Sequence, residues 1–473
     1  MKKCYRFLAA ALFLVLLATV GCNMNEDKEI NFDKQANAEG VPVYHSEEEF
    51  TLGAWYSPDA KEELWRWLKE SNLNEVTIFP ANIQSEEYLK AALGYCRQFG
   101  IRAHVYLMNT QKLWGKDWTE LLEGYGDVIS GFDVWDEPNL ESDLSSLPTR
   151  PDLEDLLPNI EYVLENFPGT RITNTLWPNY ATDAMIGLAE GETYEDYVKA
   201  YCERIVEELP AGAERWVGTD FYPYYVERFD GGLLSNLEVL QHYGKEVGAD
   251  VYLYIQTMNS HKLNWRKPNR AELSLQYYTA LAYGVKNIQM FCYQQPKQQG
   301  AGEYGYEDGE AMITDGFTTR WDDDGNLLPA SYERTQIYYD VQSLNAEVLK
   351  MSEAYMDFEW KGVLTALGTK NRVRDDFSKL KYTLESFDGL ASCTSEENMI
   401  VGCFRDGENN DGYLITNYGN PVDLRDSRVD LDFGDRTRAI VYKGGERYLV
   451  NLIGGHYITT LSGGEGHFVV PVA

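Results

Sequence analysis

The chain has 473 residues, of which 44% are hydrophobic and 25% charged, a balance typical of a folded protein rather than a disordered one. Its formal charge of −33 argues against nucleic acid and anionic membrane surfaces as partners, because both are themselves negatively charged. The length exceeds that of one ordinary core, so we expect two domains.

The N-terminus has the features of a secretory signal, predicted over residues 1–21. Lys2, Lys3 and Arg6 precede an apolar run over 7–20, which is shorter than the roughly 20 residues that a membrane span needs. The run ends in Thr19-Val20-Gly21-Cys22, which resembles the bacterial lipobox, although Thr19 departs from the usual leucine. That resemblance implies lipidation of Cys22 and an exported lipoprotein at the outer membrane or cell surface. Any membrane attachment is then expected through this lipid alone.

Residues 22–48 are predicted to be a polar tether. The remaining cysteines are scattered and no CxxC pair occurs, so the sequence predicts neither a zinc site nor any other metal or cofactor. Cys393 and Cys403 could pair across a hairpin, which the sequence leaves open.

From residue 49 to 353 short apolar strands alternate with amphipathic helices. The predicted strands cover 51–58, 75–82, 101–109, 131–139, 170–180, 214–224, 249–259 and 286–296. Several of the intervening helices end in glycine, which favours a left-handed helix cap at 99–102, 167–171 and 247–250. Eight such units predict an α/β fold, a (β/α)8 TIM barrel. A doubly wound sheet is the alternative, but no glycine-rich fingerprint follows the first strand.

Residues 354–473 differ in pattern from the barrel. Their apolar segments are short, at 399–406, 412–419, 438–444, 447–455 and 467–472, and turns rich in Gly, Asn and Asp separate them. This pattern predicts a C-terminal antiparallel β-sandwich with an accessory role.

Active sites of such barrels lie at the carboxyl ends of the strands, so the last residues of each predicted strand are the site candidates. The candidates for substrate binding are Trp55, Tyr56, Asn82, Asn109, Trp135, Asp136, Trp177, Tyr222, Tyr224, Gln256 and Tyr293, with His104, Tyr106, Asn174, Asn179, Asn259, Gln294 and Gln295 as further strand-end residues. Aromatic rings that stack on sugars and amides that bond hydroxyls predominate in this set. It therefore favours a carbohydrate as the partner, although aromatics at strand ends also cap barrel cores.

The fourth strand ends in Asp136-Glu137-Pro138. The barrel, this Glu-Pro pair and the C-terminal β-domain resemble clan A glycoside hydrolases, in which a Glu at the end of strand four is the general acid/base. The resemblance implies that role for Glu137, with Asp136 in place of the usual Asn. Independently, a neighbouring carboxylate or tryptophan raises the pKa of an acid, and Pro138 restricts Glu137 to extended backbone. The alternative is a carboxylate that caps a helix.

At strand seven the chain departs from the clan. The clan places its nucleophilic Glu there, whereas this chain has Gln256, and an amide cannot serve as a carboxylate nucleophile. The best substitute is Asp220, at the end of strand six. A wide separation from Glu137 would favour inversion with Asp220 as base, and a close one retention with Asp220 as nucleophile. Asp220 could instead bond a substrate hydroxyl or cap a turn.

Two main functions follow from these patterns, and a barrel hydrolase of another bond is a third, weaker one. The first is a cell-envelope glycoside hydrolase acting on an oligo- or polysaccharide, with Glu137 and Asp220 as catalytic residues. The second is a non-catalytic, lipid-anchored glycan-binding protein with a degenerate hydrolase barrel.

Overall fold

The structure is a computed structural model that describes residues 41–79, 85–107, 110–296, 309–317, 320–321, 327–328, 330–370, 376–419, 423 and 425–473. The predicted signal peptide, the lipidation site Cys22, most of the tether, Asn82 and Asn109 lie outside these residues.

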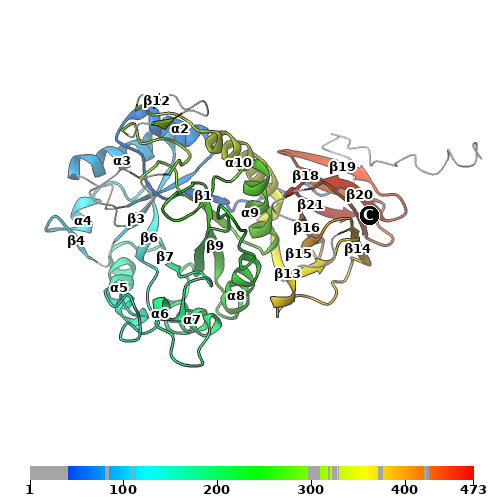
Figure 1. The fold of residues 1–473 in the computed structure, drawn as a ribbon, viewed down its shortest axis with the longest axis horizontal. Coiled ribbons are helices and arrows are strands. Elements are labelled where there is room, and N and C mark those ends of the chain that lie inside the picture. The colour runs from blue at the N-terminus through cyan, green and yellow to red at the C-terminus, as the bar shows by residue number, and fades with distance from the viewer. Residues whose placement is uncertain are drawn as a thin grey trace, which may run out of the picture.

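Eight parallel strands form the barrel that the sequence predicts (Figure 1). They are β1 (Thr51–Ala54), β2 (Glu75–Ile78), β3 (Arg102–Tyr106), β6 (Ile129–Asp136), β7 (Arg171–Leu176), β8 (Trp216–Phe221), β9 (Asp250–Gln256) and β10 (Asn287–Phe291). Their order is β1-β10-β9-β8-β7-β6-β3-β2. β1 and β2 stand at the two ends of this order, and two backbone hydrogen bonds join them. The Asn74 N–H donates to the Leu52 carbonyl (2.9 Å), and the Ser57 N–H donates to the Thr77 carbonyl (3.1 Å). The TIM-barrel prediction is therefore confirmed.

Helices surround the strands (Figure 1). They are α2 (Glu62–Glu70), α3 (Glu86–Phe99), α4 (Trp118–Leu121), α5 (Leu157–Asn166), α6 (Asp183–Ile186), α7 (Tyr194–Tyr201), α8 (Leu233–Glu246), α9 (Arg270–Ala282) and α10 (Gln336–Tyr355). Gly100 caps α3 in the left-handed conformation, as predicted, with φ 63°. Gly169 and Gly248 also have positive φ, but they lie beyond the cap residues Phe167 and Val247. No helix in the described ranges is long and apolar enough to cross a membrane.

The segments between barrel elements add short pieces of structure. A hairpin of β4 (Lys112–Leu113) and β5 (Lys116–Asp117) follows β3, and β11 (Arg320–Trp321) pairs with β12 (Leu327–Leu328) before α10. A 3-10 turn at Leu153–Leu156 leads into α5, and a π-helical turn at Cys202–Val206 extends α7.

Two antiparallel sheets pack together after α10, as the β-sandwich prediction requires. One sheet has the order β13-β15-β16-β21-β18-β19 and the other β14-β17-β20. The strands are β13 (Phe358–Ala366), β14 (Ser392–Ser395), β15 (Met399–Asp406), β16 (Asp411–Asn417), β17 (Ser427–Asp432), β18 (Arg438–Lys443), β19 (Glu446–Asn451), β20 (His456–Leu461) and β21 (Gly466–Val472), with a 3-10 turn at Phe377–Lys379. Apolar side chains of both sheets, among them Val401, Leu431 and Val469, form one core. Cys393 and Cys403 are both free thiols.

The sandwich rests on the outer wall of the barrel, against α9 (Figure 1). The indole of Trp360 donates to the Ala282 carbonyl (3.0 Å), and the Thr416 hydroxyl donates to the Tyr278 carbonyl (3.1 Å). A Cβ at Gly402 would lie 2.2 Å from the Ala282 carbonyl oxygen, so only glycine permits this close approach. The contact is therefore specific, and it involves a helix on the barrel's outer wall.

Candidate active site

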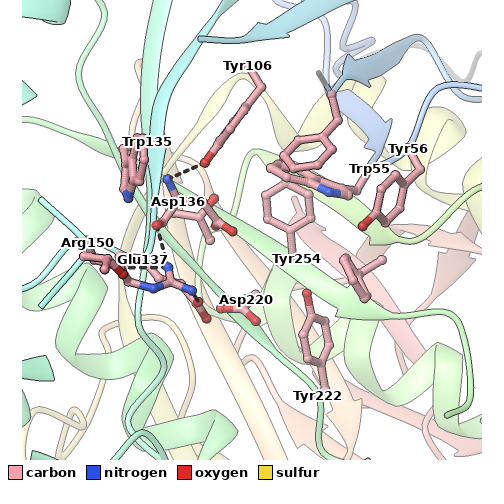
Figure 2. Close-up of a pocket in the computed structure, with 14 residues that line it drawn as sticks. Trp55, Tyr56, Tyr106, Trp135, Asp136, Glu137, Arg150, Asp220, Tyr222 and Tyr254 are labelled. Carbon is pink, nitrogen blue, oxygen red and sulfur yellow. Dashed lines mark hydrogen bonds and ion pairs between the residues drawn. The ribbon is translucent and has the colours of Figure 1, made fainter. Parts of the chain in front are cut away.

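A cavity of about 480 Å³ opens at the carboxyl ends of the barrel strands. Its walls are formed by Trp55, Tyr56, Phe79, Tyr106, Trp135, Asp136, Glu137, Thr149, Arg150, Thr175, Asp220, Tyr222, Tyr254 and Phe291. Figure 2 shows the three carboxylates between Arg150 on one side and the rings of Trp55, Tyr56, Tyr254 and Tyr222 on the other. The cavity combines acids with aromatic walls, and every described residue that lines it belongs to the barrel.

Three consecutive residues of β6 and the turn after it reach this cavity, although neighbours on a regular strand point to opposite faces. The pairing of β6 with β7 shifts register between Asp133 and Trp135, as at a β-bulge, and bulges re-aim side chains next to functional sites. The irregularity thereby allows Trp135, Asp136 and Glu137 to line one wall.

The backbone of Glu137 differs from the prediction. Pro138 was expected to hold Glu137 in extended geometry, but φ is 50°, in the left-handed region. The Glu137 N–H donates to the Thr175 carbonyl on the next strand (2.7 Å), which fixes this turn at the end of β6. The extended-backbone prediction is therefore wrong, because a bond between strands outweighs the local preference. A non-glycine residue in this region stores strain on the order of 1 kcal/mol, as functional sites often do.

Arg150 holds the Glu137 carboxylate from the loop before α5. Its guanidinium lies 2.8 Å from a carboxylate oxygen of Glu137 and donates to the carbonyls of Asp136 (2.7 Å) and Glu137 (3.1 Å). It also lies over the ring of Trp177, 4.5 Å from the centroid. Arg150 therefore orients Glu137 and leaves about a sixth of that side chain, 17%, exposed.

The pKa values of the three acids are all raised. Burial, and then the charges of Asp220 and Asp136, raise the pKa of Glu137 well above its usual value, against the opposing effect of Arg150. Burial and the charge of Asp136 raise the pKa of Asp220 to about 7. Burial also raises the pKa of Asp136 to about 6, and Arg150 lowers it. One cation faces three acids, so at neutral pH the cluster retains a proton, and Glu137 has the environment of a general acid.

The structure brings eight of the predicted strand-end residues to the cavity: Trp55, Tyr56, Tyr106, Trp135, Asp136, Glu137, Asp220 and Tyr222. Asp220 is 9% exposed, and one of its carboxylate oxygens is buried without a hydrogen-bond partner. Neither carboxylate caps a described helix, which was the alternative for Glu137.

Gln256 lies behind the cavity wall and is fully buried. Its amide oxygen accepts from the Tyr224 N–H (2.8 Å), and its amide nitrogen donates to the carbonyls of Tyr224 (3.1 Å), Met258 (3.3 Å) and Arg266 (3.1 Å). All its polar atoms are thus used to hold the segments that follow β8 and β9. The structure does not place Gln256 as a substrate-binding residue.

Three other predicted binding residues also lie outside the cavity lining. Trp177 packs beneath Arg150, as described above. The hydroxyl of Tyr224 donates to the Glu272 carbonyl (2.8 Å), and that of Tyr293 donates to the Leu64 carbonyl (2.9 Å). These aromatics support the barrel rim, which was the alternative reading of a strand-end ring.

Six lining residues were not predicted: Phe79, Thr149, Arg150, Thr175, Tyr254 and Phe291. Phe79 and Phe291 stand at strand ends, so a wider search at those positions would find them. Tyr254 lies two residues before the end of β9 and shares a face with Gln256 by alternation, yet its ring reaches the cavity. Thr149 and Arg150 come from a loop, where no sequence periodicity marks them.

Among the described residues, no group of three His, Cys, Asp or Glu side chains is placed to hold a metal ion.

No family model matches the chain, and no curated protein matches it in sequence. Solved structures do match its fold. A catalytic mutant of a GH42 β-galactosidase from Geobacillus stearothermophilus aligns with a TM-score of 0.55 at 11% identity, over 91% of this chain and 99% of that one. A GH27 β-L-arabinopyranosidase from the same organism (TM-score 0.42, 9% identity, 90% and 96% covered) and a GH5_18 protein from Bifidobacterium longum (0.42, 10%, 63% and 78%) are more distant.

At these identities the likeness concerns the fold alone. The barrel and the C-terminal β-domain together therefore share the fold of that GH42 structure. The chemistry has to be argued from the cavity.

Proposed function

We propose that this protein is a glycoside hydrolase acting on an oligo- or polysaccharide, with Glu137 as general acid and Asp220 as the second carboxylate. The observation that carries the proposal is the meeting of these two acids, from the ends of β6 and β8, in one aromatic-walled cavity. We further propose that a lipid on Cys22 attaches the enzyme to the cell envelope, which rests on the sequence signal.

Glu137 protonates the leaving-group oxygen as the glycosidic bond breaks. A general acid has to keep its proton at neutral pH, and the raised pKa of Glu137, caused by burial and by the charges of Asp220 and Asp136, provides this. Arg150 fixes the direction of the carboxyl group because its guanidinium lies 2.8 Å from a carboxyl oxygen and donates to the carbonyls of Asp136 and Glu137.

Asp220 supplies the negative charge that the reaction needs on the other carboxylate. With a pKa of about 7 it is partly ionised at neutral pH, and its buried oxygen without a partner is available to a reacting atom. As a base it takes a proton from the attacking water and the anomeric centre inverts; as a nucleophile it bonds that carbon first and the configuration is retained. Either route replaces the carboxylate that Gln256 cannot supply.

The non-catalytic alternative rests on one observation, the amide of Gln256 where clan A hydrolases have their nucleophile. In this reading the same cavity binds a glycan without cleaving it. The two functions differ in whether any glycosidic bond is hydrolysed.

A screen of aryl glycosides and polysaccharides with wild type, Glu137→Gln and Glu123→Gln tests the proposal. Glu123 is exposed on the barrel surface and does not line the cavity, so its variant is a matched control for the loss of one carboxylate. We expect Glu137→Gln to lower kcat/KM about 10²- to 10⁴-fold, the usual contribution of a general acid, and Glu123→Gln to match wild type. A Glu137→Gln protein as active as wild type would contradict the assignment, and glycan binding without any hydrolysis would favour the alternative.

A further inference from the structure

The cavity has more acids than its one cation can balance. Asp136, Glu137 and Asp220 face it, and Arg150 is the one basic side chain among the described residues that line it. Arg150 is also already engaged by Glu137, by two backbone carbonyls and by the ring of Trp177. The other titratable groups described in the lining are the hydroxyls of Tyr56, Tyr106, Tyr222 and Tyr254. Behind the wall, the buried Asp133 feels the charge of Asp136, Tyr194 that of Asp220 and Tyr197 that of Glu137. Among its described residues, the lining therefore holds three carboxyl groups against one cation.

Two of the three carboxylates have acceptor capacity that the protein does not use. One oxygen of Asp220, a residue nine-tenths buried, has no hydrogen-bond partner. The Asp136 carboxylate accepts no hydrogen bond from any described group, although its own N–H donates to the Tyr106 hydroxyl (3.1 Å). Leaving the buried Asp220 oxygen unbonded costs about 1–3 kcal/mol, and the half-buried Asp136 carboxylate is open to the cavity, so a ligand that brings N–H donors is favoured here.

The walls also suit a positive charge. Eight aromatic side chains line the cavity: Trp55, Tyr56, Phe79, Tyr106, Trp135, Tyr222, Tyr254 and Phe291. Trp55 lies at the centre of this group, with ring centroids 5.5 Å from Tyr106 and 5.4 Å from Tyr254. Ring faces attract cations, especially where water is excluded, and they also stack on the C–H faces of sugars.

An acidic sugar does not fit this lining. Its carboxylate would need a free cation, and the guanidinium of Arg150 is committed to holding Glu137. The unbonded acceptors described in the cavity are carboxylate oxygens, and the protein as a whole carries −33. Uronic acids and sulfated sugars would be repelled by the carboxylates of the cavity and by the negative charge of the whole protein.

We infer that the sugar bound in this cavity carries a free, protonated amine, that of a hexosamine unit, and that Asp136 is the carboxylate that receives it. The inference rests on the proposed function and narrows its substrate class to cationic glycans. Glu137 and Asp220 are assigned to bond cleavage, so Asp136 is the acid that remains for recognition. Its carboxylate accepts the ammonium N–H bonds, and the surrounding rings hold the charged group and the sugar face.

Binding of matched monosaccharides tests this inference without requiring hydrolysis. Glucosamine, galactosamine and mannosamine are each compared with the parent hexose, the N-acetyl sugar and the uronic acid, by calorimetry or ligand-observed NMR. The titrations are run near pH 6.5. This is below the pKa of an amine, which is therefore charged, and above the Asp136 pKa of about 6, so that this carboxylate is largely ionised. At least one amine is expected to bind about ten- to a hundredfold more tightly than its three counterparts, the contribution of a charge-assisted hydrogen bond.

The variant Asp136→Asn is expected to remove this preference, and the exposed Asp143→Asn is expected to keep it. If Asp136→Asn does not fold, titration of wild type with KCl serves instead, because an ionic contact weakens with salt. The inference is overturned if no amino sugar binds, if a neutral or acidic counterpart binds as tightly, or if the preference survives Asp136→Asn or high salt.

The outcomes separate this inference from the proposed function. Hydrolysis of a neutral glycan with no amine preference overturns the inference alone. Amine preference without hydrolysis of any glycan overturns the proposed function alone.

Discussion

The two ends of the barrel bury carboxylates in opposite ways. At the amino end, Glu75 is fully buried beside Arg171. Burial raises the pKa of Glu75, but the charge of Arg171 and the interaction with His104 outweigh it, so the pKa is lowered. At the carboxyl end, burial and the neighbouring acids raise the pKa values of Glu137 and Asp220, although Arg150 lies 2.8 Å from Glu137. Removing one partner of a buried acid–cation pair destabilises the fold, whereas buried acids beside each other are retained at a cost in stability, which is typical of functional sites.

This difference gives the two ends opposite pH dependence. Glu75 titrates below its unfolded value, so it contributes stability that is present above that value and is lost as the pH falls through its lowered pKa. Asp220 ionises at about 7 in the fold and near 3.8 when unfolded, so its contribution reduces stability as the pH rises between these values.

Glu75→Gln is the change with the largest expected effect on this comparison. It leaves the buried guanidinium of Arg171 without its counter-charge, and losing one partner of such a pair costs about 3–5 kcal/mol in the free energy of unfolding. Urea denaturation at neutral pH measures it. The control Glu48→Gln removes an acid from the same end, where Glu48 forms an exposed 3.6 Å pair with Lys286, and should cost about 0–1 kcal/mol. An equal loss in the free energy of unfolding in the two variants would show that the buried pair contributes no more to stability than the surface pair.

Gln256→Glu tests whether the amide at the end of β9 is a lost nucleophile or a structural group. A carboxylate there would replace the amide nitrogen by an oxygen that faces the carbonyls of Tyr224, Met258 and Arg266. We expect unfolding to become easier by about 1–3 kcal/mol or more, and activity not to rise, because the side chain does not reach the cavity. Gln256→Met, of similar length but without the amide, is the matched comparison. A gain in hydrolysis by Gln256→Glu would contradict the structural role.

The fold could be predicted because it depends on repeated local patterns. Eight apolar strands separated by helices specify the barrel, and the strand-end rule then locates residues such as Trp55 and Glu137. The rule fails for Trp177, Tyr224 and Tyr293, because whether a terminal ring turns toward the cavity depends on packing against distant segments. Two further features, the irregular pairing of β6 and the contact made by Arg150, arise only when strands and loops meet in space.

Asp136→Asn makes the smallest expected change, in the pH profile of kcat/KM. Activity requires Asp220 ionised and Glu137 protonated, so the profile should be a bell whose acid limb follows Asp220, with its pKa of about 7. The charge of Asp136 raises the pKa of both groups. Its removal should therefore move both limbs toward acid by about one pH unit or less, equivalent to at most about 1.4 kcal/mol.

The exposed variant Asp143→Asn should leave the bell in place, which controls for the loss of one charge from the same region. Normalised profiles of kcat/KM for the three proteins measure the displacement. If the pH profile of kcat/KM is the same in Asp136→Asn as in wild type, the acids titrate independently. The contrast between the paired acid at one end of the barrel and the clustered acids at the other would then lose its electrostatic basis.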